Sequence, residues 1–309
     1  MPSMWDILPA PLRRLFGVKA NVVRPPYDHA WEWNLYMMAY RLGLNMETAY
    51  RLMDGGPMLP HYRYRHFAIP KKDGTPREIV EPGPTLKIVQ RKLLKMYLGK
   101  PKPHPAALGF RRKKSIADHA WTHAGAAIII TADIENFFPN TLRKRVKGWW
   151  RQQGYSTLEV RLLTSLTTYR GCLPQGAPTS PTLSNLVNFG MDTALERWVR
   201  QANGKYTRYA DDLVFSWPEG SEPPADFEQI VRAILRESGY ALHPRKGWRV
   251  WRRADEPEVT GLILRRRGEV DLPDSMRCVM KLLAASDDPG DQRRLTGYRG
   301  YESMIRRRV

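Results

Sequence analysis

Two adjacent carboxylates, Asp211 and Asp212, interrupt an apolar stretch in the sequence YTRYADDLVFSW at residues 206–217. Neighbouring side chains on a β-strand point to opposite faces, and a buried carboxylate without a partner is strongly unfavourable. A chain with this pattern must therefore fold so that positive charge meets the pair. A third acid, Asp133, follows the apolar run AAIIITA much earlier in the sequence, so any meeting of the three acids is tertiary.

The three acids predict a metal site if folding brings them together. Converging carboxylates repel one another unless a divalent cation neutralises them, and hard oxygen ligands favour Mg²⁺ or Mn²⁺. Two such ions can activate an attacking hydroxyl and stabilise the leaving pyrophosphate of a phosphoryl transfer. An Asp-Asp pair alone is also common in solvated turns, but the apolar residues that flank this pair favour the metal site.

The charge balance of the chain points to a nucleic-acid partner. The 309 residues include 50 Lys and Arg against 31 Asp and Glu, a formal net charge of +19. Such an excess attracts polyanions; a protein that is merely basic is the alternative. The length allows more than one lobe.

Cysteine usage and the lack of a targeting segment favour a protein of the reducing cytoplasm without a membrane anchor. Cys172 and Cys278 form no CxxC pair, so neither a disulfide framework nor a structural zinc site is expected. Pro and Arg interrupt the apolar residues at the N-terminus too early for a signal peptide. The longest uncharged run, residues 171–191, contains three prolines and several polar residues and is no membrane span.

Hydrophobic periodicity and turn residues predict a mixture of strands and helices. We expect helices within 28–54 and at 85–98, 141–153, 157–168, 181–202, 224–239 and 276–286. We expect a hairpin at 62–83 and strands at 126–138, 206–217, 248–253 and 258–270. Because no regular βαβ rhythm is present, the predicted class is α+β rather than a doubly wound sheet.

Three motifs carry a resemblance to a known family. YADD follows LPQGAPTSPTLSNL at 173–186 and ADIENFFPN at 132–140, and this order and spacing resemble the conserved blocks of the reverse transcriptases. The resemblance runs from about Tyr64 to Gly268. QGAPTSP is similar to bacterial retron and group II intron enzymes, and the triplet Val259–Thr260–Gly261 resembles one that retron enzymes carry. His119 in HAWTH stands where the retron pattern has Asn.

The resemblance implies an α+β right-hand polymerase with fingers, a palm built on an antiparallel sheet with packed helices, and a helical thumb. The expected division is a helical extension at 1–60, fingers at 61–132, a palm at 133–271 with a fingers insertion around 141–185, and an RNA-binding thumb at 272–309.

The implied activity is RNA-directed DNA synthesis by a retron enzyme that copies a structured noncoding RNA into a short single-stranded DNA. The implied partners are this RNA, its cDNA, dNTPs and an effector protein in defence against phage. The alternatives are another defence-associated or group II intron-derived bacterial reverse transcriptase, and a non-catalytic RNA-binding protein.

The resemblance also assigns roles to single residues. Asp133, Asp211 and Asp212 are the expected catalytic residues and ligands of two Mg²⁺ ions, or of Mn²⁺, together with the carbonyl of Ile134. Phe138 resembles the aromatic gate that selects deoxynucleotides, although plain core packing is the interpretation without the motif. The expected nucleotide contacts are Lys71 or Lys72, Arg77, Phe138 and Gln175.

Basic clusters and aromatic residues indicate the nucleic-acid surface. The stretch that begins at Trp248 alternates aromatic and basic side chains, which is typical of a surface that stacks bases and follows phosphates, but such tryptophans are equally often core. Clusters such as RRKK at 111–114 are expected to contact the backbone. His119 and His123 have no third ligand for a zinc site. The expected contacts are Arg111, Arg112, Lys113, Lys114, His123, Lys246, Trp248, Arg249, Arg306 and Arg307.

Overall fold

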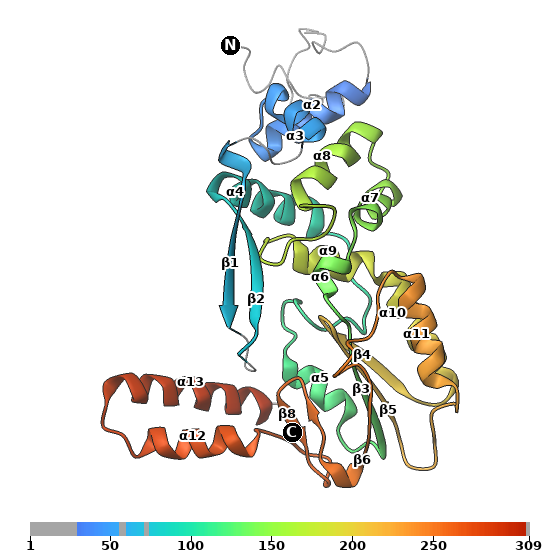
Figure 1. The fold of residues 1–309 in the computed structure, drawn as a ribbon, viewed down its shortest axis with the longest axis vertical. Helices are drawn as coiled ribbons and strands as arrows, with labels where there is room; N and C mark the ends of the chain where they lie inside the picture. Colours follow the sequence, from blue (N-terminus) through green and yellow to red (C-terminus); the bar gives the residue numbers. More distant parts are fainter. Residues whose placement is uncertain (1–29, 56–59, 71–73, 307–309) are drawn as a thin grey trace, which may run out of the picture.

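The structure, a computed structural model, describes residues 30–55, 60–70 and 74–306. Helices occupy one end of its long axis, and a four-stranded sheet with covering helices occupies the other (Figure 1). A pair of helices projects sideways from the sheet end. The predicted α+β class is confirmed.

The helical end consists of segments from three separate parts of the sequence, within residues 30–55, 84–98 and 143–167. They are α2 (Ala30–Leu42), α3 (Met46–Gly55), α4 (Pro84–Leu93), the π-helical turn η2 (Leu94–Leu98), α7 (Arg143–Gln152) and α8 (Thr157–Thr167). Their apolar faces share one buried core that includes Leu35, Leu86 and Trp150. A capping box starts α8, because the Ser156 hydroxyl accepts from the Glu159 amide while the Glu159 carboxylate accepts from the Ser156 amide.

An antiparallel hairpin extends from these helices toward the sheet end (Figure 1). It consists of β1 (Tyr64–Pro70) and β2 (Pro76–Pro82) and follows a short 3₁₀ turn, η1 (Pro60–Tyr62). Most of its side chains are exposed, including Phe67 and Ile69. The predicted hairpin is confirmed, and its tip at 71–73 lies outside the described residues.

The main sheet is antiparallel and has the strand order β4-β5-β3-β6. The strands are β3 (Ile128–Asp133), β4 (Lys205–Tyr209), β5 (Asp212–Trp217) and β6 (Arg249–Arg252). Helices α10 (Phe189–Gln201) and α11 (Phe227–Glu237) cover one face and share a core with Phe215 and Trp217. The sheet thus joins segments that lie far apart in the sequence.

The other face of the sheet packs against α5 (Ile116–His123) and a small sheet of β7 (Glu258–Val259), β8 (Leu262–Leu264) and β9 (Val270–Asp271). Alternation along β3 separates the two cores: Ile128 and Ile130 belong to the core under α10 and α11, and Ile129 belongs to the core under α5. A strand buried on both faces reads as the uninterrupted apolar run seen in the sequence.

The projecting pair consists of α12 (Asp274–Ala284) and α13 (Pro289–Arg306) (Figure 1). The Arg265 guanidinium contacts Asp271 at the end of β9 and Asp274 at the start of α12, at 3.3 and 2.8 Å. This arginine therefore ties the first helix of the pair to the small sheet. Among the helices that the structure describes, none combines the length and the apolar character needed to cross a bilayer.

The long helix predicted at 181–202 is two helices, α9 (Ser180–Val187) and α10. The Asn188 side chain, between them, donates to the Ser184 carbonyl and to the Tyr240 hydroxyl at 2.8 and 2.9 Å. An asparagine amide that bonds to backbone and tertiary partners competes with helix continuation, so the break is a tertiary effect.

The strand predicted at 126–138 is also shorter than expected, because β3 ends at Asp133. Asn136 has a φ of +46°, and the short helix α6 (Phe137–Asn140) follows it. The 3₁₀ turn η3 (Arg253–Asp255) completes the described elements. Of the extension predicted at 1–60, the structure describes residues 30–55 and 60, which include α2 and α3.

Candidate active site

The structure brings the three predicted acids together at the ends of two neighbouring strands. Asp133 is the last residue of β3, Asp212 is the first residue of β5, and the two are direct partners across the antiparallel pair. Asp211 precedes Asp212 in the turn from β4, and its carbonyl accepts a hydrogen bond from the Ile134 amide at 3.0 Å. This hydrogen bond joins the acid-bearing turn to the residue that directly follows β3.

Electrostatics at this cluster favour a cation. Burial, together with the charges of Asp211 and Asp133, raises the pKa of the Asp212 carboxyl to about 7. Burial also raises the pKa of Asp211, against the opposing positive charges of residues that include Arg77 and Lys246. Ionised carboxylates at these positions therefore need more positive charge than the neighbouring side chains supply.

The residues present fit divalent ions that bind together with a substrate. Within residues 30–55, 60–70 and 74–306, no group of three or more acidic, histidine or cysteine side chains is placed so that protein ligands alone could hold a metal ion. Mg²⁺ commonly takes one or two protein carboxylates and completes its shell with waters and substrate phosphates. Asp133 and the Asp211–Asp212 pair offer oxygen ligands of this kind.

The turn that carries Asp211 and Asp212 is tight and strained. Tyr209 of β4 pairs directly with Asp212 of β5, which leaves a two-residue loop, Ala210–Asp211. Ala210 has a φ of +60°. Two-residue hairpin loops need such positive φ angles, but glycine or asparagine usually supplies them. The Ala210 conformation must therefore be held by the surrounding structure.

Aromatic rings lie next to the acids. Phe138 is half-buried, with its ring centroid 5.9 Å from that of Phe110 and 5.5 Å from that of Phe137. Phe110 is 45% exposed and lies 6.5 Å from Tyr209. Phe138 packs against both hydrophobic cores and keeps part of its ring exposed, so both interpretations of its role stay open. Sequence reasoning missed Phe110, which no motif marks.

The loop that contains Gln175 lies against the hairpin. The Val80 amide of β2 donates to the Gln175 carbonyl at 2.7 Å. Gly176 has a φ of +132°, and a Cβ at this position would lie 3.1 Å from the Val80 carbonyl oxygen. The glycine therefore permits close approach to β2. Arg77 on the same strand is exposed and opposes the rise in the Asp211 pKa, whereas Lys71 and Lys72 lie outside the described residues.

Several basic residues predicted to contact nucleic acid have exposed side chains. The exposed residues are Arg112, Lys113, Lys114, Lys246, Arg249 and Arg306. Lys114 also pairs with Asp118 at 3.3 Å, and Arg306 with Glu302 at 2.7 Å. Arg111 is different, because its guanidinium donates to carbonyls of the preceding loop, including that of Ala107 at 3.2 Å. Arg307 lies outside the described residues.

Trp248 packs into the protein. Its half-buried ring lies 6.2 Å from Phe215 on β5 and 5.9 Å from Phe227 on α11. Of the two interpretations left open by the sequence, the contacts favour core packing.

His123 departs from the sequence-based expectation of an RNA contact. Its side chain is fully buried, with Nδ1 2.7 Å from the Ser216 hydroxyl and Nε2 2.7 Å from the Thr207 hydroxyl. Burial lowers its pKa well below the usual value. The ring is thus a neutral link between α5 and the sheet. Ala117 and Ala120, on the same helical face, were the signal that this face is buried.

His119 joins two segments that carry the retron resemblance. Its Nδ1 lies 2.6 Å from the hydroxyl of Thr260, the middle residue of the Val-Thr-Gly triplet. Its ring also stacks on Tyr209 with a centroid distance of 5.9 Å, and burial lowers its pKa to about 4. A neutral imidazole thus supports the tyrosine that precedes the acid-bearing turn.

Comparison with known proteins agrees with this site. The sequence model described as reverse transcriptase (RNA-dependent DNA polymerase) matches residues 69–264. The retron Mx162 reverse transcriptase of Myxococcus xanthus is 34% identical over 233 residues, which cover 67% of this chain and 48% of that protein. The retron Ec86 reverse transcriptase of Escherichia coli is 31% identical over 233 residues, which cover 75% of this chain and 71% of that protein.

A solved structure supports the fold alone. Apo telomerase from Candida tropicalis, truncated from its C-terminal domain, superposes with a TM-score of 0.50 at 11% identity and covers 69% of this chain and 55% of that one. This match confirms the right-hand fold predicted from the sequence.

An antiparallel sheet with three acids at the ends of two neighbouring strands, beside a hairpin that carries Arg77, is the arrangement expected of a polymerase-type palm. The chain belongs to the reverse transcriptase family, on its bacterial retron-type branch. It spans about half the length of the Myxococcus relative and seven-tenths of the Escherichia coli one.

Proposed function

We propose that the chain is the RNA-directed DNA polymerase of a retron, which copies a structured noncoding RNA into a short single-stranded DNA. The observation that carries the proposal is the direct pairing of Asp133 with Asp212 at the acid-bearing turn. The two strands come from distant parts of the sequence, yet they end with carboxylates at the same place. Such convergence suits phosphoryl transfer and has no use in a protein that binds RNA without chemistry.

The acids would hold two divalent ions, Mg²⁺ or Mn²⁺, with the carbonyl of Ile134 as a further ligand. When bound, such ions activate the attacking hydroxyl and neutralise charge on the leaving pyrophosphate. Of the chain's own groups, Arg77 is exposed on β2 and close enough to Asp211 to affect its pKa. We assign Arg77 to the triphosphate, together with Lys72, and Gln175 to the nucleotide.

Phe138 is proposed to select deoxynucleotides by crowding a 2′-hydroxyl. Phe138→Ala is expected to raise ribonucleotide incorporation relative to deoxynucleotide incorporation by about tenfold or more, because a steric barrier of roughly 1.4 kcal/mol is removed. Competition assays with matched dNTP and rNTP pairs measure the ratio. The matched control is Phe137→Leu, which changes the fully buried neighbour and should leave the ratio unchanged. An unaltered ratio in Phe138→Ala would assign its ring to the core.

The test of the proposed function is the identity of the DNA that the protein makes. The purified protein is incubated with its co-purified RNA, Mg²⁺ and dNTPs, and all DNA products are sequenced; a reaction without dNTPs is the control. A short DNA with one start point on one noncoding RNA supports the retron function. Products copied from many unrelated RNAs would contradict it and favour another bacterial branch.

Four further proposals accompany this function. The exposed basic residues Arg112, Lys113, Lys246 and Arg249 are proposed to contact the RNA or its cDNA backbone, and α12 and α13 to form the thumb. An effector protein in defence against phage is a proposed partner. The few cysteines support a cytoplasmic location.

A further inference from the structure

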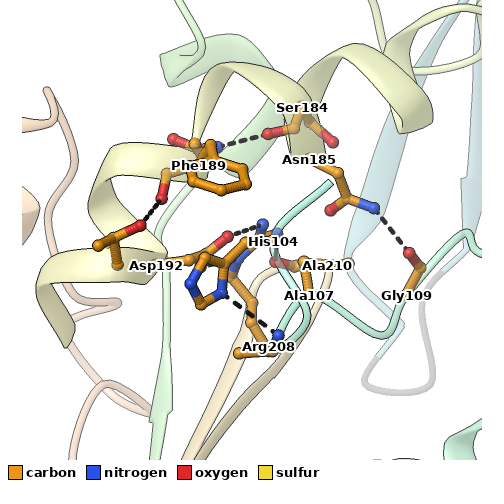
Figure 2. A network of polar contacts seen from close by, with 12 residues as sticks. His104, Ala107, Gly109, Ser184, Asn185, Phe189, Asp192, Arg208 and Ala210 are labelled. Atoms are coloured by element: carbon orange, nitrogen blue, oxygen red, sulfur yellow. Dashed lines mark hydrogen bonds and ion pairs between the residues drawn. The ribbon is translucent and has the colours of Figure 1, made fainter. Parts of the chain in front are cut away.

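The side chain of Arg208 is completely buried beside the turn that carries the catalytic acids. Arg208 lies on β4 and pairs with Asp192 on α10, and the exposed fraction of both side chains is 0%. Nε and Nη2 of the guanidinium donate to the two carboxylate oxygens at 2.8 and 2.7 Å (Figure 2). Such a pair is weak evidence for stability, because apolar residues of similar volume often stabilise a protein as well or better. Stability alone therefore does not explain why a buried ion pair stands at this position.

The remaining nitrogen of the guanidinium reaches the acid-bearing turn. Nη1 of Arg208 donates to the carbonyl oxygen of Ala210 at 3.0 Å. The φ of +60° at Ala210 costs a non-glycine residue about 1–2 kcal/mol. Because Asp192 fixes the planar guanidinium, Arg208 determines where this carbonyl lies. The carbonyl belongs to the peptide that joins Ala210 to Asp211.

A loop holds the same turn from another direction. Gly109 approaches so closely that a Cβ would lie 2.7 Å from the Ala210 nitrogen. The buried Asn185 of α9 donates to the Gly109 carbonyl at 2.8 Å (Figure 2). The loop is also hydrogen-bonded to the Arg208 backbone through both its amide and its carbonyl. The Arg208 side chain and the close approach of Gly109 therefore hold the strained turn at Ala210, in addition to the hydrogen bond from the Ile134 amide to the Asp211 carbonyl.

We infer that Arg208 is a positioning residue for DNA synthesis. Pinned by Asp192, it holds the Ala210–Asp211 peptide in the one arrangement that presents Asp211 and Asp212 to the divalent ions. The inference rests on the proposed polymerase function. It assigns to the buried pair a task that an apolar pair could not perform, because only a fixed donor can bind the Ala210 carbonyl.

The test replaces both charges together, with Arg208→Met and Asp192→Leu in one protein. Removal of the whole pair leaves no unpaired charge but deprives the buried Tyr206 hydroxyl and the Ala210 carbonyl of their partners, so the melting temperature is expected to fall by only a few degrees. The kcat for dNTP incorporation is expected to fall about 100-fold, the usual effect of displacing catalytic groups by about 1 Å. The KM for dNTP should change far less. Mn²⁺ affinity, measured by calorimetry without nucleic acid, should also fall.

A matched control lies in the same network. Tyr206 donates to the same Asp192 carboxylate at 2.8 Å but does not contact the turn. Tyr206→Phe should lower the melting temperature and leave kcat and Mn²⁺ affinity unchanged. If the double variant does not fold, Arg208→Lys serves instead, since one ammonium cannot hold two carboxylate oxygens and the Ala210 carbonyl with the same geometry.

Wild-type kcat and Mn²⁺ affinity in the folded double variant, or in Arg208→Lys, would overturn the inference. Equal losses of kcat and Mn²⁺ affinity in Tyr206→Phe and in the double variant would overturn it too. They would indicate that any disturbance of this core lowers activity, and not the loss of the contact to Ala210. Failure of the proposed function would give a different result, because the wild type itself would make no DNA. The Mn²⁺ affinities of the wild type and the variants would then still show whether Arg208 positions the acids.

Discussion

Asp212→Asn is expected to abolish DNA synthesis while making the protein more stable. The pKa of Asp212 is raised to about 7 by burial and by the charges of Asp211 and Asp133, so at pH 8 its ionised form destabilises the folded chain relative to the unfolded one. Asn removes that charge at nearly constant shape. The melting temperature at pH 8 with EDTA should rise by about 2–6 °C.

Asp212→Asn is expected to lower the activity although it raises the melting temperature. Without this carboxylate, incorporation of labelled dNTPs should fall at least about 1,000-fold, equal to about 4 kcal/mol of transition-state stabilisation. Asp226→Asn, which alters an exposed acid before α11, is the control and should change neither quantity. Retained activity in Asp212→Asn, or a loss of activity together with a lower melting temperature, would contradict the assignment of Asp212 as a metal ligand.

Gly109→Ala is expected to reduce kcat by about 100-fold. The added Cβ would lie 2.7 Å from the Ala210 nitrogen and 3.2 Å from the Tyr209 carbonyl carbon, and backbone atoms cannot swing away as a flexible side chain can. Either the loop or the turn must shift, and the turn carries two of the three acids. Single-turnover incorporation measures the chemical step, and thermal melting measures the accompanying loss of stability.

Gly204→Ala is the matched control for this prediction. Its Cβ would meet Val199 Cγ1 at 2.7 Å and Trp217 Nε1 at 2.8 Å, which is comparable crowding beside the same sheet but in the core beneath α10. Gly204→Ala should therefore lower the melting temperature without a comparable loss of kcat. If the two variants lost activity in proportion to stability, the effect of Gly109→Ala would be general unfolding rather than displacement of the turn.

Local sequence patterns were sufficient to predict most of the secondary structure. The apolar run before Asp133 and the apolar residues on either side of Asp211 and Asp212 predicted the central strands. The Lys-Lys-Asp-Gly turn between two strand-like segments predicted the hairpin. These signals depend on residues close in sequence, which is why they could be interpreted correctly from the sequence. The convergence of Asp133 with Asp212 followed from the motif order and not from any local pattern.

Tertiary contacts decided the features that the sequence did not predict. Asn188 breaks a periodic helix because Tyr240, far along the chain, accepts from its side chain. His123 is a core residue because Ser216 and Thr207 satisfy both ring nitrogens. A polar residue on an otherwise apolar helix face has two interpretations until its partners are known.

The contacts of Arg208 and Asp192 at the acid-bearing turn could not be predicted from the sequence either. Arg208 stands in a strand and Asp192 in a helix, and each is an ordinary surface residue type by sequence alone. Their complete burial and shared contact to Ala210 required the folded structure. Phe110 likewise lies beside Phe138 and Tyr209, on a loop that no motif marks.

The most direct test of the central claim is crystallography of the protein with Mn²⁺ and an incoming dNTP, with the ions located by anomalous scattering. The account predicts Mn²⁺ bound by carboxylate oxygens of both Asp133 and the Asp211–Asp212 pair, with the triphosphate completing its shell. Mn²⁺ bound elsewhere, or held by the pair without Asp133, would contradict it.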